Sequence, residues 1–113
     1  EPLRGAKGQT WECGIRVPGI LRWSGHITPG QTIESVASLL DFYPSLLELW
    51  NAPTPADRPL DGVSLWSNLH MTSPPLSTPM QRERETLFHY CGSTITAVRQ
   101  GRYKAHFYTP QWD

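Results

Sequence analysis

The sequence lacks the features that mark several large classes of protein. Its 113 residues carry ten basic and ten acidic side chains, so the formal net charge is zero with histidine neutral. No basic run is present, which argues against a nucleic-acid partner. No apolar stretch approaches the roughly 20 residues that a membrane helix needs, so we expect no membrane segment in this chain. Two cysteines, Cys13 and Cys91, are too few to define a disulfide framework, and whether they pair stays open.

Proline and tryptophan, by contrast, are plentiful. The chain has eleven prolines and five tryptophans, while charged residues make up only 18% of it. Disordered chains are poor in aromatic residues, so this composition does not indicate disorder. It indicates one small, loop-rich domain or a piece of a larger one.

The stretch LRGAKGQTWECGIRVPGILRW, near the beginning of the chain, places one cation on a flexible backbone. Lys7 lies between Gly5 and Gly8, and glycine allows a tight bend or a close approach to neighbouring groups. Two interpretations are open: an exposed surface turn, or a loop that directs one ammonium group into a cleft. The apolar residues that follow predict short strands at Ile15–Val17 and Ile20–Trp23, separated by a Pro-Gly break.

The clearest helical pattern follows in TIESVASLLDFYPSLLELWN. Apolar residues recur there at spacings of three and four, which places them on one face of a helix. Pro44 interrupts the pattern and is best accommodated in a first helical turn. We therefore predict two short helices or one kinked helix, over about 34–42 and 44–51, with Ser35 as the N-cap.

The last third of the chain changes to β character. TLFHYCG and TITAVRQGRYKAHFYT are rich in β-branched and aromatic residues. Gln100-Gly101 predicts a hairpin turn between TAVR and YKAHFY. Residues 71–84 hold three prolines, small polar residues and a charge run, which indicates a linker. Upstream of them, Asp61-Gly62 is a typical turn pair.

Four ordered stretches resemble the C-terminal portion of a sulfatase, in the arylsulfatase and steroid-sulfatase branch. They are LRGAKGQTWECGIRVPGILRWSGHI, SVASLLDFYPSLLEL, DRPLDGVSL and LFHYCGSTITAVRQGRYKAHFYTP. The resemblance implies an α/β enzyme with the alkaline-phosphatase-like fold. Residues 1–70 then correspond to the tail of the large catalytic domain, 71–84 to a linker, and 85–113 to the start of a small antiparallel subdomain.

The resemblance also implies a chemistry. Sulfatases use a formylglycine, made from the cysteine of a C-x-P-S-R motif, and a calcium ion that polarises the sulfate oxygens. Neither Cys13 nor Cys91 is followed by Pro-Ser-Arg, and no Asp-Asp or Asp-Asn pair is present to hold a metal. The chain is thus expected to be a fragment, inactive alone, of a sulfuric ester hydrolase that cleaves aryl or steroid sulfates. The same resemblance points to the secretory route, meaning lysosome, endoplasmic reticulum or extracellular space.

One site residue is implied for this chain, namely Lys7. In the family, the lysine of the Gly-Lys-Gly loop contacts the substrate sulfate. The physical reason is that a fixed cation in a partly dry cleft stabilises the negative charge that gathers on the sulfate oxygens as the ester bond breaks. Lysine suits this role because its ammonium is a compact point charge.

The residues after the loop have plainer interpretations. We expect Trp11 to pack against the loop and Glu12 to pair with Arg16 along one strand. Cys13 stands where the family usually has glycine, so a side chain there is expected to strain the turn. The Asp61-Gly62 pair belongs to the family pattern Asp-Gly-x-Ser-Leu and is expected to be a structural turn.

The four histidines are not expected to be catalytic. His89 and His106 lie in apolar strands and are predicted to be satisfied core or rim residues. His26 and His70 lie in loops without other ligands at metal-binding spacing, so no metal site is predicted.

Two alternatives to the sulfatase fragment stay open. The first is a non-catalytic remnant that acts as a binding or interaction module. This interpretation is open because the matched region omits the nucleophile. The second alternative is a phosphohydrolase of the same superfamily, although the GKG and YKAHF stretches resemble the sulfatase branch more closely.

Overall fold

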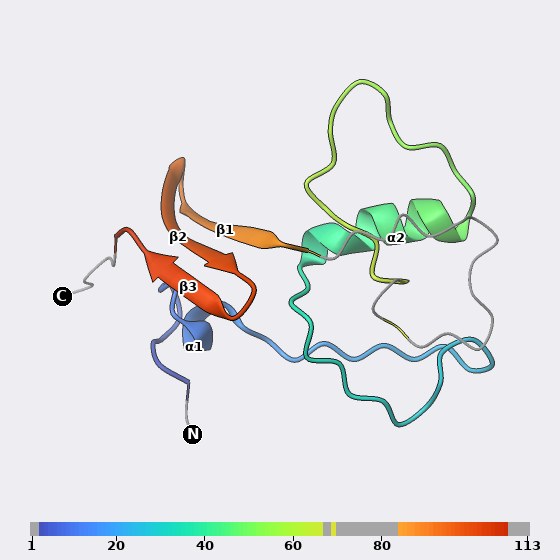
Figure 1. Ribbon diagram of the computed structural model, residues 1–113, viewed down its shortest axis with the longest axis horizontal. Helices are drawn as coiled ribbons and strands as arrows, with labels where there is room; N and C mark the ends of the chain where they lie inside the picture. Colours follow the sequence, from blue (N-terminus) through green and yellow to red (C-terminus); the bar gives the residue numbers. More distant parts are fainter. Residues whose placement is uncertain (1–2, 67–68, 70–83, 109–113) are drawn as a thin grey trace. The chain divides into compact units, whose positions relative to one another are not determined.

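The computed structural model describes residues 3–66, 69 and 84–108 (Figure 1). Contacts between residues divide the chain into two units. The first, which we call the sheet unit, consists of Glu1–Ile20 and Glu85–Asp113. The second, here the helix unit, is Leu21–Arg84. The predicted boundaries at 70, 71–84 and 85 fall largely outside the described residues, and the domain assignment stays a prediction.

The sheet unit contains a three-stranded antiparallel sheet in the order β1-β2-β3. The strands are β1 (Thr86–Cys91), β2 (Thr94–Gln100) and β3 (Tyr103–His106), drawn from orange to red in Figure 1. The predicted β character of this region and the predicted hairpin are confirmed. Its two-residue loop is Gly101-Arg102 rather than the predicted Gln100-Gly101, because Gln100 still belongs to β2 and pairs with Tyr103. A one-residue irregularity after His89 shifts the register between β1 and β2.

One face of this sheet gathers basic side chains. His89 lies opposite Ala97, which in turn lies opposite His106. Two residues along β2, Arg99 lies opposite Lys104. Since side chains two apart in a strand point to the same face, these four basic residues share one face around the fully buried Ala97.

The helix unit is built on a short 3-10 turn that leads into a helix. The turn η1 (Leu39–Asp41) is followed by α2 (Phe42–Leu49). Ser38 caps the turn, because its hydroxyl accepts a bond from the Leu40 N–H at 3.3 Å. In return, the Asp41 carboxylate accepts from the Ser38 N–H at 2.7 Å, which completes a capping box.

This cap corrects the first predicted helix. Residues 34–38 are not helical, and Ser35 is not an N-cap, since the Ser38-to-Asp41 box begins the helical segment instead. The second predicted helix, at 44–51, is confirmed as α2 with bounds two residues earlier. Pro44 lies in the first turn of α2, where backbone N–H groups have no helical partner to lose.

The predicted strands at Ile15–Val17 and Ile20–Trp23 were wrong. Ile15 ends the short helix α1 (Glu12–Ile15), and residues 16–23 have neither strand nor helix structure. A strand needs a neighbour for its backbone groups, and no described residue pairs with this segment. Val17 and Ile20 are 75% and 92% exposed.

Buried apolar side chains are scarce in the described residues. Leu65 and Ala97 are the buried hydrophobic residues there. Many large apolar side chains are exposed on both units, among them Leu39, Trp50, Phe88, Tyr103 and Phe107. Extensive exposed apolar surface is typical of a polypeptide that packs against another one.

Candidate functional site

Lys7 lies at the tip of a tight turn. The Gln9 N–H donates to the Ala6 carbonyl oxygen at 3.1 Å, and the Gln9 side-chain oxygen accepts from the Ala6 N–H at 3.0 Å. Gly8 occupies the third turn position with a φ of 88°, which favours glycine. Because both ends of the turn are bonded to each other, the exposed Lys7 side chain projects from a defined backbone.

An aromatic stack holds the backbone that follows the turn. The Trp11 ring stacks on the His106 ring of β3 with centroids 3.9 Å apart, and the Arg4 guanidinium lies 3.9 Å from the Trp11 ring centre. The Thr10 hydroxyl lies 3.3 Å from His106 Nδ1, within hydrogen-bond distance. Trp11 is therefore a packing residue, as expected.

Glu12 joins the same loop to the sheet by two ion pairs. Its carboxylate oxygen lies 3.0 Å from Lys104 Nζ and 3.1 Å from an Arg99 terminal nitrogen. The predicted interaction of Glu12 with Arg16 is the weakest of the charge contacts of this carboxylate, because α1 brings Glu12 into ion-pair distance of Lys104 and Arg99 instead. Burial raises the pKa of Glu12, but the Lys104 hydrogen bond and the charges of Lys104 and Arg99 outweigh it and leave the pKa below its usual value.

The strain expected at Cys13 is absent. The backbone of Cys13 has no positive φ, and the residue is exposed within α1. The position that requires glycine is Gly14, where an added Cβ would overlap the Gln9 and Ala6 carbonyl oxygens. The turn can therefore close onto α1 because Gly14 has no side chain. Cys13 and Cys91 are both free thiols.

The two strand histidines lie where their side chains are partly withdrawn from water. Burial lowers the pKa of both His89 and His106, and the nearby Lys104 charge lowers it further. His106 contacts Trp11 and Thr10, as expected of a satisfied residue. His89 Nε2 is buried without a hydrogen-bond partner among the described residues, which corrects the prediction that this histidine is satisfied.

The described residues offer no ligand set for a metal ion. No group of three or more His, Cys, Asp or Glu side chains there could hold one. His26 stacks on Trp23 with ring centroids 4.0 Å apart, and His70 lies outside the described residues. Nor is any described helix long and apolar enough to span a bilayer.

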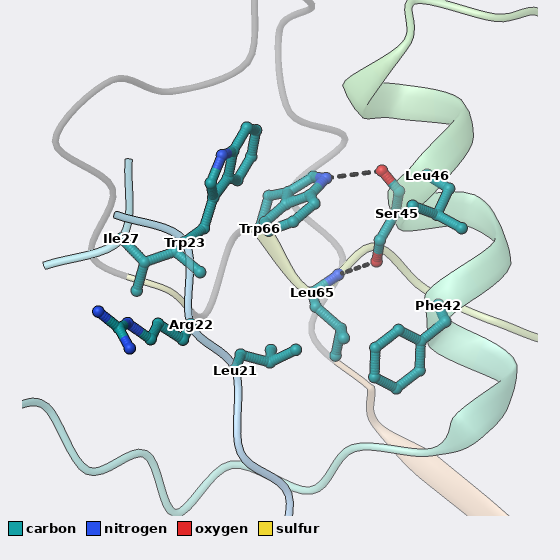
Figure 2. Close-up of a pocket in the computed structure, with 9 residues that line it drawn as sticks. All are labelled: Leu21, Arg22, Trp23, Ile27, Phe42, Ser45, Leu46, Leu65 and Trp66. Atoms are coloured by element: carbon teal, nitrogen blue, oxygen red, sulfur yellow. Dashed lines mark hydrogen bonds between the residues drawn. The ribbon is translucent and has the colours of Figure 1, made fainter. Parts of the chain in front are cut away.

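An apolar pocket of about 330 Å³ lies in the helix unit and was not predicted from the sequence. Figure 2 shows the residues around it, which come from the segment near Trp23, from α2 and from the stretch ending at Trp66. Ser45 organises one wall, because its hydroxyl accepts from the Leu65 N–H at 2.8 Å and its carbonyl accepts from the Trp66 indole at 2.7 Å. Among the described residues that line it, Arg22 alone is charged.

Comparison with known proteins gives matches along nearly the whole chain. Residues 1–52 match the family model described as Sulfatase, and residues 82–113 match the one for the C-terminal region of aryl-sulfatase. A steryl-sulfatase of Rattus norvegicus is 40% identical over 97% of this chain and 19% of its own length. An arylsulfatase A of Bos taurus is 44% identical over 95% of this chain and 20% of its own length. The chain thus spans about a fifth of the length of these relatives.

Proposed function

This chain belongs to the sulfatase family, and we propose that it forms the C-terminal part of an enzyme that hydrolyses sulfuric esters. Family membership implies the alkaline-phosphatase-like α/β fold. The small antiparallel sheet and the short helix of the described residues are consistent with a part of that fold. Within this enzyme, the chain supplies Lys7 to the substrate sulfate.

The observation that carries this assignment is an unpaired cation on an anchored turn. Among the described residues, no acidic side chain forms an ion pair with Lys7, although Glu12 in the same loop is paired twice. A cation without a partner, on a backbone held by hydrogen bonds and ring stacking, is available to bind an anion. It would stabilise the charge that develops on the sulfate oxygens, and more strongly where water is excluded.

Calcium and formylglycine do not fit the residues of this chain. The described part offers no metal ligand set, and the sequence has no C-x-P-S-R motif. We assign both groups to polypeptide outside this chain, where they would supply the Lewis acid and the nucleophile. The residues of this chain bind and orient the sulfate.

Aryl or steroid sulfates are the substrates we propose. The support is the similarity to proteins named steryl-sulfatase and arylsulfatase, over 95% or more of this chain. The same relatives support a location on the secretory route. The absence of a basic run supports a small-molecule sulfate ester, rather than a nucleic acid, as the partner.

The test begins with the complete reading frame that contains this chain. We expect a C-x-P-S-R motif upstream of Glu1 and hydrolysis of para-nitrophenyl sulfate by the complete protein. Lys7→Ala should lower kcat/KM by about 10²–10³-fold, as loss of one charge-stabilising group does. Asp57→Asn, which removes an exposed ion pair in the helix unit, is the matched control and should leave activity unchanged. Turnover by the 113-residue chain alone, lost in Lys7→Ala, would contradict the assignment of the nucleophile to other polypeptide.

A non-catalytic binding module is the second candidate, and the absence of a C-x-P-S-R nucleophile motif from the sequence favours it. A chain that folds by itself should unfold cooperatively on heating as a monomer. A fragment that has lost its apolar neighbours should associate and unfold without a sharp transition. Thermal unfolding with light scattering on the 113-residue chain therefore separates the two candidates.

A further inference from the structure

We propose that Glu12 is a positioning residue, which sets the place of Lys7 by tying the lysine turn to strands β2 and β3. This inference rests on the proposed role of Lys7 in binding sulfate. It assigns to the C-terminal hairpin, far along the sequence, a part in the geometry of the sulfate site.

The backbone links Glu12 to Lys7 through a short closed loop. The Cys13 N–H donates to the Arg4 carbonyl oxygen at 3.0 Å, so the two ends of the segment that contains the lysine turn are joined. Glu12 directly precedes this closure. A displacement of Glu12 is therefore transmitted to Lys7 through a loop that has little freedom to absorb it.

The sheet makes Glu12 necessary, because two cations lie directly opposite each other. Arg99 and Lys104 are register partners on β2 and β3, and like charges in this arrangement repel. Their side chains are only 24% and 11% exposed, so water screens the repulsion incompletely. The Glu12 carboxylate lies within ion-pair distance of both cations. Without this carboxylate, the same face would repel the cationic loop.

The loop is attached to β3 at two points, which fixes its orientation as well as its position. Glu12 contacts Lys104, while Trp11 and Thr10 contact His106 two residues further along the strand. Adjacent loop residues thus bind adjacent side chains on one face of β3. Loss of the Glu12 carboxylate would leave only the attachment at His106, about which the turn could rotate.

Kinetics of the complete protein with para-nitrophenyl sulfate test this role. Glu12→Gln keeps the shape of the side chain and removes its charge, and we expect kcat/KM to fall about 10- to 100-fold through misplacement of Lys7. The decisive variant is the double one. If Glu12 acts through Lys7, then adding Glu12→Gln to Lys7→Ala should cause no further loss. Losses that multiply in the double variant would overturn the proposal, because they would place the effect of Glu12 elsewhere.

Variants at Lys104 keep the test decisive if Glu12→Gln fails to fold. Lys104→Arg preserves the ion pair at β3 and should retain activity, whereas Lys104→Met leaves Glu12 paired with Arg99 alone and should lower kcat/KM, by less than Glu12→Gln does. Equal activity of the two Lys104 variants would refute the proposal. Asp57→Asn again serves as the control for loss of a carboxylate from an ion pair.

Chemical labelling gives a readout that does not depend on turnover. Acetic anhydride modifies exposed lysines, and sodium sulfate should slow acetylation of Lys7, measured by peptide mass spectrometry, in the unmodified sequence but not in Glu12→Gln. Protection that persists in Glu12→Gln would refute positioning alone and leave the proposed function standing. A protein without aryl-sulfate hydrolysis and without protection of Lys7 would refute the proposed function, and the positioning role with it.

Discussion

Replacement of Asp41 by asparagine should release the helix unit from its main polar anchor. The Asp41 carboxylate is 1% exposed and accepts bonds from the Ser38 N–H at 2.7 Å and the Val63 N–H at 2.9 Å. It also pairs with the Arg84 guanidinium, which is 7% exposed. One side chain therefore joins the start of the helical segment to two stretches that are distant in sequence.

The size of the effect follows from this burial. Asparagine is nearly isosteric and retains one acceptor oxygen, but it removes the negative charge opposite Arg84. Breaking a buried ion pair by removing one partner costs about 3–5 kcal/mol, because the buried Arg84 guanidinium would lose the carboxylate that faces it. Since about 1.4 kcal/mol is a factor of ten, local opening of this region should become roughly 10²- to 4 × 10³-fold more frequent.

Hydrogen exchange followed by mass spectrometry measures this opening directly. The Leu65 amide is a suitable reporter, because it donates to Ser45 Oγ and not to Asp41. We expect its protection in Asp41→Asn to fall by that factor. Asp57→Asn is the matched control, since its pair with Arg58 is 63% and 73% exposed and contributes little. Equal protection of Leu65 in the two variants would refute the idea that the buried carboxylate anchors this unit.

Two further predictions concern close packing and pH. Gly62→Ala should lower the free energy of unfolding by about 1–3 kcal/mol in urea titrations, because the new Cβ would overlap the Leu40 carbonyl oxygen. Gly19→Ala is the control, since a Cβ there meets open space and should be near neutral. Equal urea midpoints for the two variants would contradict this prediction. The pKa values of His89 and His106 lie below 6.5 in the folded state, so the unfolded chain takes up protons first as pH falls. Proton uptake by the unfolded chain favours unfolding, and the thermal midpoint should therefore decline from about pH 6.5 downward. The double replacement of both histidines by glutamine should flatten that decline, while the stability from Glu12 persists until pH falls below 4.5. An unchanged slope in the double variant would count against the burial of these two rings.

Patterns within a few residues were good guides to local structure. Alternating β-branched and aromatic residues around Gln100-Gly101 indicated the β2–β3 hairpin, and apolar spacing around Pro44 indicated α2. Gly5 and Gly8, on either side of Lys7, predicted a turn there. Both have a positive φ, a conformation that glycine adopts readily. These elements depend on interactions between near neighbours, which local sequence encodes.

Local patterns failed where the answer depended on distant partners. The apolar stretch from Ile15 to Trp23 resembles a strand, yet no described residue pairs with it. Ser35 and Ser38 are both acceptable caps by composition, and the bond from the Ser38 N–H to Asp41 decides between them. A side chain fits at Cys13, where we expected strain, and would not fit at Gly14. The carbonyl oxygens that exclude a Cβ at Gly14 come from the folded lysine turn.

The sequence by itself determined the family, the lysine turn, the hairpin and helix α2, because ordered motifs and short-range periodicity carry that information. The tertiary structure decided which charges meet. It placed Glu12 beside Lys104, 92 positions away, and Asp41 beside Arg84, 43 positions away. A carboxylate in a sequence can pair with any cation that the chain brings near it, and only the packed fold, by burying a few pairs and leaving the rest in water, selects the partners.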